Sequence, residues 1–164
     1  MKLIRISTAA VAATIQQVAS ASDGRREAAA FWLGSPENSS VQTITIPAGE
    51  GVELYRRSLR ISEDWMNLLG EFCDSSQQVV LGAVHSHPEE AFHSEIDSDG
   101  FFHAPDFVSV VVPNYGNTAL AKADSEWAVY VGLPWGKWRS SRWGTEVLLV
   151  EGLPFALRTL RLPK

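Results

Sequence analysis

The segment Val79-Val80-Leu81-Gly82-Ala83-Val84-His85-Ser86-His87-Pro88 joins a β-strand pattern to a pair of histidines. The run Val79–His85 is rich in β-branched and apolar residues, which predicts a strand. Pro88 has no backbone N–H for a sheet ladder, so the chain must leave the sheet there. Side chains two residues apart on a strand point to the same face, and His85 and His87 are therefore placed to reach one metal ion.

A second cluster of polar residues follows the histidine pair. Asp97 comes ten residues after His87, and Ser94 lies three residues before Asp97. In a helical turn these two side chains share a face, and we expect both to project toward the histidines. Two His and one Asp leave a fourth tetrahedral position open, which is the arrangement of a catalytic zinc site. The pattern therefore predicts Zn²⁺ bound by His85, His87 and Asp97.

A hydrolytic zinc site also needs a base that is not a metal ligand. Glu27 is the candidate, because it heads the apolar segment Glu27–Leu33, which we interpret as a buried strand. The alternative is a solvated carboxylate beside Arg25 and Arg26. Ser94 is the candidate hydrogen-bond donor to the oxyanion of a tetrahedral intermediate.

The rest of the chain predicts one mixed α/β domain over residues 1–164, with a mixed β-sheet and two main helices. One helix starts after Ser7 and runs to about Ala21, with Gly24 just beyond. The other starts at Ser62, precedes the histidine strand and ends near Asp74. Further strands are expected at Lys2–Ile6, Val41–Ile46, Val52–Arg57, Phe107–Val112, Glu126–Val131 and Thr145–Val150, with a Trp- and Gly-rich loop over residues 134–144.

The charge pattern sets one segment apart from the rest of the chain. The 164 residues include 14 basic and 19 acidic ones, a net charge of −5. No Lys or Arg occurs between Arg60 and Lys122, a stretch that holds ten carboxylates and all four histidines. Such a stretch suits a bound cation, with a solvated acidic loop as the alternative, and it argues against a nucleic-acid surface.

Cysteine content and apolar run length exclude several classes of protein. The single cysteine, Cys73, excludes an internal disulfide framework, and we expect an inert thiol at a helix end. No apolar run approaches the roughly 18 residues of a membrane span, so we expect no membrane partner and a cytoplasmic protein. The phosphate-binding glycine motifs are missing, and no nucleotide cofactor is expected.

Glu27, His85-Ser86-His87-Pro88 and Ser94-Glu95-Ile96-Asp97 together resemble the JAMM motif of the MPN/JAB metalloproteases. The resemblance covers about Ile6 to Gly116 and includes the apolar strand after Glu27, which ends in Leu-Gly as in that family. One feature departs from the family pattern. Six residues separate His87 from Ser94, where the family usually has seven, which leaves Asp99 as an alternative metal ligand.

The resemblance implies a zinc-dependent isopeptidase or peptidase with an MPN/JAB-like fold. It implies cleavage after the C-terminal glycine of ubiquitin or a ubiquitin-like modifier. Cognate activating and conjugating enzymes, some of them in bacterial antiviral defence, are the implied partners. The alternatives are a peptidase that trims a sulfur-carrier or small-molecule conjugate, and a non-catalytic MPN scaffold. The segment Trp135–Trp143 is our candidate contact for the modifier, unless its tryptophans cover a sheet face.

The ligand assignment predicts one zinc ion per chain. We expect His85→Ala and Asp97→Ala to lose zinc, because each removes one of three protein ligands. Elemental analysis of the purified variants measures this directly. Zinc kept by both variants would contradict the site, whereas zinc kept by Asp97→Ala alone would assign the third position to Asp99.

Overall fold

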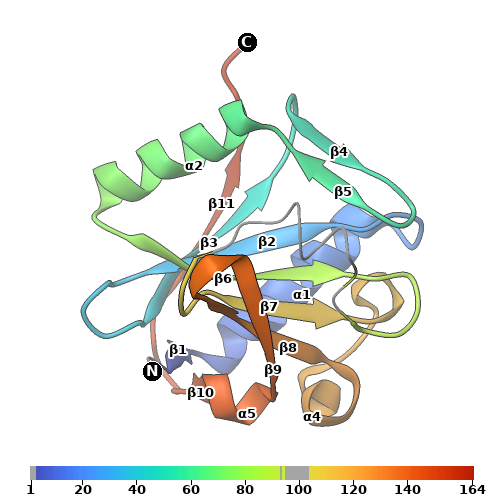
Figure 1. Cartoon of the computed structure of the whole chain (residues 1–164). Coiled ribbons are helices and arrows are strands. Elements are labelled where there is room, and N and C mark those ends of the chain that lie inside the picture. Colours follow the sequence, from blue (N-terminus) through green and yellow to red (C-terminus); the bar gives the residue numbers. More distant parts are fainter. Residues whose placement is uncertain (1–2, 93, 95–103) are drawn as a thin grey trace.

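A seven-stranded mixed β-sheet forms the centre of the computed structural model, which describes residues 3–92, 94 and 104–164 (Figure 1). In spatial order its strands are β11 (Ala156–Leu160), β3 (Val41–Pro47), β2 (Ala29–Gly34), β6 (Val79–Ser86), β7 (Val108–Val112), β8 (Ala128–Leu133) and β9 (Lys137–Ser141). Strands β6 and β7 are parallel, as are β11 and β3, and the other neighbours are antiparallel. The sheet confirms the mixed α/β class.

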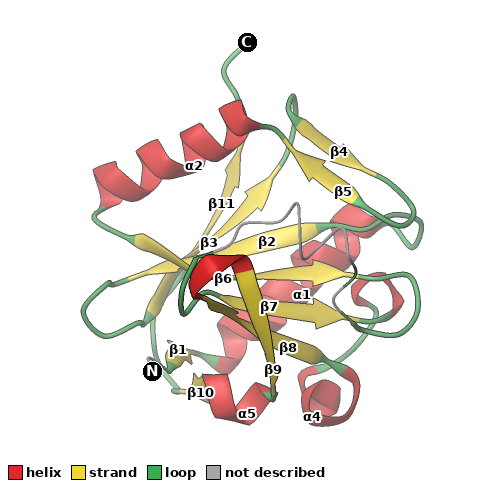
Figure 2. Ribbon diagram, in the orientation of Figure 1, coloured by secondary structure: helices red, strands yellow, loops and turns green. Residues whose placement is uncertain are grey.

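Two long helices, α1 (Thr8–Ser22) and α2 (Glu63–Ser76), confirm the two main helices expected from the sequence (Figure 2). Each begins at a serine cap: Ser7 Oγ accepts a hydrogen bond from the Ala10 amide at 3.0 Å, and Ser62 Oγ accepts one from the Trp65 amide at 3.2 Å. The short helices are α4 (Ala123–Glu126) and α5 (Trp143–Glu146). In the described residues, no helix is both long and apolar enough to cross a membrane.

The two faces of the sheet bury different sets of side chains. Alternate residues of β2 point to opposite faces. Ala30 and Trp32 belong to the cluster that packs with α1, which lies behind the sheet in Figure 1. Phe31 and Leu33 belong to the cluster on the other face, with Trp65, Leu69 and Cys73 of α2. Every strand residue near the histidine pair can therefore be assigned to the α1 face or the α2 face.

Two small sheets flank the large one. Strand β1 (Ile4–Ile6) pairs in parallel with β10 (Val147–Leu149), and β4 (Val52–Leu54) pairs with β5 (Leu59–Ile61) in a hairpin. The strand expected over 52–57 was too long, because residues 55–58 form the hairpin turn, in which the Tyr55 amide donates to the Ser58 carbonyl at 2.9 Å. Strand β5 has no counterpart among the expected strands.

The prediction of a loop over residues 134–144 is wrong for the middle of this segment. Residues 137–141 form β9, which pairs with β8 in register from Val129–Ser141 to Leu133–Lys137. Strand β11 was also not expected, and it pairs in parallel with β3. Both are edge strands with largely exposed side chains, so they lack the apolar runs that identify buried strands.

Gly34 is required by a close backbone approach at the end of β2. A Cβ at this position would overlap the Ser40 carbonyl oxygen and lie 2.8 Å from the Leu81 side chain. We expect Gly34→Ala to lower the free energy of unfolding by about 1–3 kcal/mol, because backbone atoms must shift to admit the methyl group. Gly70→Ala is the matched control, since nothing lies within 4 Å of its Cβ position on exposed α2. A helical alanine there should stabilise by up to about 1 kcal/mol. Equal effects of both changes in a denaturant titration would contradict this account.

Candidate metal and catalytic site

The pairing of β2 with β6 positions the two histidines. Ala29 lies opposite His85 in the antiparallel ladder, and the His87 amide donates to the Val112 carbonyl of β7 at 2.9 Å. Both histidines point to the α2 face, and both are buried. Their ring centroids are 5.3 Å apart, with an angle of 55° between the ring planes. Two neighbouring strands thus hold the imidazoles side by side at one end of the sheet.

Glu27 lies next to His87 because the same pairing continues past the end of β2. The Ser86 amide donates to the Ala28 carbonyl at 3.0 Å, and the Ala28 amide donates to Ser86 Oγ at 3.1 Å. One residue further along, Glu27 Oε1 lies 4.0 Å from His87 Nε2. Glu27 is only 3% exposed, so it is not the solvated carboxylate that its arginine neighbours allowed. A buried carboxylate needs a polar or charged neighbour, and the imidazole supplies one.

Ser86 lies between the two histidines and points to the opposite face. Its Oγ is 2.9 Å from Ser22 Oγ at the end of α1, besides accepting the hydrogen bond from the Ala28 amide. All these groups are buried. Ser86 therefore connects the histidine strand, the segment that carries Glu27 and the end of α1. The sequence offered no signal for this role, because it depends on which face the serine occupies.

A pocket of about 500 Å³ opens beside Glu27 and His87. Phe92, which is 53% exposed, forms an edge-to-face contact with the His87 ring, with centroids 4.7 Å apart. Ser94 is half-buried and lines the same pocket. The residues that line the pocket are Glu27, Arg57, His87, Pro88, Glu89, Glu90, Phe92 and Ser94.

The predicted third ligand, Asp97, and its alternative, Asp99, lie outside the described residues. Within residues 3–92, 94 and 104–164, no three His, Cys, Asp or Glu side chains gather as a metal site. The part of the donor set that is described fits zinc, since His85 and His87 lie together on one face and imidazole nitrogen is an ordinary zinc ligand. Glu27 lies beside His87.

The turn that follows β7 braces the chain after His87. Asn114 and Tyr115 both have left-handed backbone conformations, each with φ of 54°. In this geometry the Tyr115 amide donates to the His87 carbonyl at 2.7 Å, and the Tyr115 hydroxyl donates to the Arg56 carbonyl at 3.0 Å. Left-handed backbone at a bulky residue is costly and persists where surrounding contacts impose it. Tyr115 was not identified from the sequence as a site residue, because its contacts join segments far apart in the chain.

Cys73 takes no part in the pocket. The residue is buried near the end of α2 and belongs to the core cluster on that face. Burial raises the pKa of the Cys73 thiol, and the charge of Asp74 raises it further. A raised pKa keeps the sulfur protonated and poorly nucleophilic. These properties agree with the inert thiol expected from the sequence.

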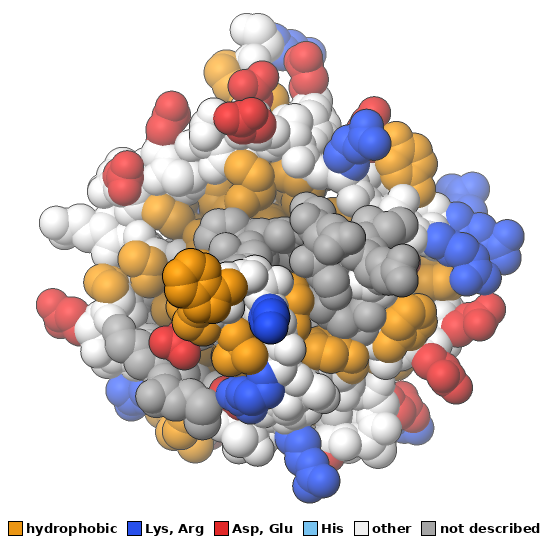
Figure 3. All heavy atoms as spheres, viewed as in Figure 1, with side chains coloured by type: hydrophobic (Ala, Val, Ile, Leu, Met, Phe, Trp, Pro, Cys, Tyr) orange, Lys and Arg blue, Asp and Glu red, His pale blue; other side chains and the backbone are white. Residues whose placement is uncertain are grey.

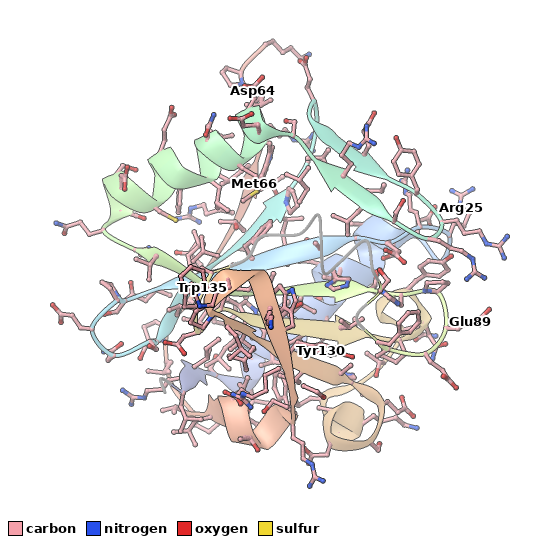
Figure 4. All side chains as sticks on the ribbon, viewed as in Figure 1. Arg25, Asp64, Met66, Glu89, Tyr130 and Trp135 are labelled. Carbon is pink, nitrogen blue, oxygen red and sulfur yellow. The ribbon has the colours of Figure 1, made fainter. Side chains whose placement is uncertain are left out.

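The C-terminal tryptophans divide into core residues and one exposed side chain. Trp127 and Trp143 are buried and stack edge-to-face, with centroids 4.9 Å apart, on the α1 face. Trp138 packs against Phe107 on the other face. Only Trp135 among these four is open to solvent, at 95% exposure. Trp135 is not among the residues that line the pocket, and Figure 4 shows it left of centre, well apart from Glu89 at the right.

Comparison with known proteins gives a likeness of fold. No protein-family model matches the chain, and no curated protein is significantly similar to it in sequence. The solution structure of protein DSY2949 from Desulfitobacterium hafniense has a TM-score of 0.60 and 16% identity, covering 92% of this chain and 95% of that chain. The crystal structure of AF2198, a JAB1/MPN domain protein from Archaeoglobus fulgidus, has a TM-score of 0.46 and 20% identity, covering 88% and 96%. The chain thus shares the fold of the Desulfitobacterium protein over nearly its whole length.

The role of Ser86 can be tested by deleting its hydroxyl group. We expect Ser86→Ala to lower the free energy of unfolding by about 1–3 kcal/mol, because the buried Ala28 amide loses its acceptor. Chemical denaturation measures the loss. Ser75→Ala is the control, since its hydroxyl bonds the Phe72 carbonyl at an exposed site and should cost far less. A Ser86→Ala protein as stable as Ser75→Ala would contradict the bridging role.

Proposed function

We propose that this chain is a zinc-dependent hydrolase that cleaves the peptide or isopeptide bond after the C-terminal glycine of a ubiquitin-like modifier. The observation that carries the proposal is the buried group of Glu27, His87 and His85 at one end of the sheet, beside an open pocket. The JAMM-like motif supports it independently. The fold shared with the Desulfitobacterium protein is compatible with the proposal and carries no information on activity.

The residues that would hold zinc are His85, His87 and Asp97. A zinc ion held there supplies a Lewis acid that polarises a water molecule and the carbonyl group of the scissile bond. The two histidines are buried two residues apart, His85 on the central strand β6 and His87 just after its end. They are therefore held rigidly, which is what a catalytic metal site requires of its ligands.

Glu27 is the proposed general base. Its carboxylate accepts a proton from the attacking water and later donates that proton to the leaving amine. The 4.0 Å separation of Glu27 Oε1 from His87 Nε2 places the carboxylate next to the proposed metal ligand. Its backbone is fixed as well, because the Glu27 amide donates to the Tyr55 carbonyl at 2.7 Å. Ser94, on the pocket wall, is the proposed donor to the carbonyl oxygen as charge develops on it.

We expect Glu27→Gln to keep the fold and zinc but to lose at least about 10²–10⁴-fold in turnover, because an amide cannot accept the proton. Ser94→Ala should keep zinc and lose about 10²–10³-fold, the loss of one oxyanion donor. Zinc content and single-turnover rates on a modifier fusion measure both effects. Near-normal turnover by Glu27→Gln would move the base to Glu89, Glu90 or Glu95.

The proposed substrate is an extended tail that ends in glycine. Such a tail lies as an added strand along backbone groups, and glycine lets the scissile bond approach the metal closely. On the described wall of the pocket, Phe92 packs edge-to-face against His87. Because Trp135 does not line the pocket, it can contact the modifier only if the modifier's globular body extends beyond the pocket as far as Trp135. Cognate activating and conjugating enzymes are the proposed partners.

Fusions of one ubiquitin-like modifier to unrelated proteins test the substrate assignment. We expect cleavage of every fusion that keeps the terminal glycine, and little cleavage when this glycine is changed to Val. The Glu27→Gln protein is the control for contaminating proteases. Equal cleavage of the Val series, or cleavage that depends on the target protein and ignores the modifier, would contradict the assignment.

A further inference from the structure

Four exposed arginines lie on the two segments next to Glu27, and one of them, Arg57, lines its pocket. Arg25 and Arg26 immediately precede Glu27, and Arg56 and Arg57 occupy the turn of the β4–β5 hairpin. Figure 3 shows Lys and Arg side chains gathered on the right of this face, where Figure 4 labels Arg25. Arg57 therefore joins this basic rim to the site, whereas Arg26 lines a separate pocket beside α1.

Backbone hydrogen bonds hold the two arginine-bearing segments against the site. The Glu27 amide donates to the Tyr55 carbonyl at 2.7 Å, which joins the residue after Arg26 to the residue before Arg56. The Tyr115 hydroxyl donates to the Arg56 carbonyl at 3.0 Å, and Tyr115 also holds the His87 carbonyl. The hairpin turn is thus fixed relative to the histidine strand, and its arginines project from a positioned backbone.

Little of this positive charge is neutralised by the protein. Arg25 pairs with Asp23 at 2.5 Å. Within the part of the chain that the structure describes, Arg26, Arg56 and Arg57 form no ion pair. The chain as a whole has a net charge of −5, so a basic rim here runs against its overall charge. Unpaired arginines beside a pocket are available to a partner of opposite charge.

The same pocket also carries acidic side chains. Glu89 and Glu90 line it, so Arg57 and these two carboxylates share one cavity. A polyphosphate backbone would meet the arginines and the glutamates together, and the glutamates would repel it. A peptide, unlike a polyphosphate, can present a carboxylate to the arginines without placing a negative charge next to the glutamates. Guanidinium groups bind carboxylates in paired hydrogen bonds, which gives direction as well as attraction.

We propose that Arg57, with Arg56, selects substrates that carry acidic side chains just before the glycine tail. The inference rests on the proposed function for the identity of the tail, and it adds the charge of the segment that the enzyme recognises. Exposed charge pairs are screened over about 8 Å at physiological salt, so selection weakens as salt is added. Each arginine is expected to change affinity about two- to fivefold.

Two labelled peptides test the charge preference by fluorescence anisotropy. They have equal length, end in Gly-Gly with an amidated C-terminus, and differ only in carrying Asp and Glu or Lys before the glycines. The Glu27→Gln protein is used for binding, so that turnover does not interfere. We expect the acidic peptide to bind about tenfold more tightly at low salt, with a smaller difference at high salt.

Arginine-to-glutamate variants test whether Arg56 and Arg57 cause the preference for the acidic peptide. Arg56→Glu/Arg57→Glu should abolish it, whereas Arg142→Glu/Arg158→Glu, with the same change in net charge at exposed positions that do not line the pocket, should keep it. Several results would overturn the inference. They are no binding of the acidic peptide, equal binding of both peptides, and a preference that survives in Arg56→Glu/Arg57→Glu. Equally tight binding of a labelled single-stranded oligonucleotide would overturn it as well. Charge-selective binding by a wild-type protein that cleaves neither peptide nor modifier fusion would instead count against the proposed function alone.

Discussion

The antiparallel pairing of β2 with β6 is the constraint on which the candidate site depends. Its register puts Ala29 opposite His85, and two hydrogen bonds between Ala28 and Ser86 carry the pairing one residue further. Glu27 then lies beside His87. Because strand side chains alternate between faces, a slip of one residue would turn both histidines into the packed face that contains Trp32. Hydrophobic burial on both faces therefore fixes the position of the catalytic candidates.

On the α1 face these strands carry core residues, and on the α2 face they carry both a core cluster and the site. Ser86 connects the two faces, because its backbone lies between the histidines while its hydroxyl group forms a hydrogen bond with Ser22 of α1. Tyr115 performs a similar task from the turn after β7, by holding both the His87 and Arg56 carbonyls. Rigid support of this kind keeps functional groups in a fixed relation, which catalysis requires within fractions of an ångström.

The electrostatic character of the pocket comes from two parts of the chain. Glu89 and Glu90 belong to the long stretch without Lys or Arg, and Arg57 lies just before that stretch. In sequence the charges form separate blocks. In the fold, the β4–β5 turn returns to the end of the histidine strand, and opposite charges line one cavity. The pocket thus carries both positive and negative side chains, although the protein as a whole is acidic.

The sequence by itself determined the fold class, the two capped helices and the strand that carries the histidines, because these follow from local patterns. Apolar runs, serine caps and a proline stop are properties of neighbouring residues. It also singled out Glu27, His87 and Ser94, which line one pocket, and His85, whose ring lies next to that of His87. The place of Asp97 stays a prediction.

Only the tertiary structure decided which side chains face that pocket. Trp127 and Trp143 proved to be core residues, and the exposed Trp135 lies away from the site. Edge strands β9 and β11 escaped prediction because exposed strands lack a continuous apolar signal. The contributions of Ser86, Tyr115 and Arg57 depend on contacts between segments far apart in the chain. Such contacts arise from sheet register and from the packing of hairpins against strands, which no local pattern encodes.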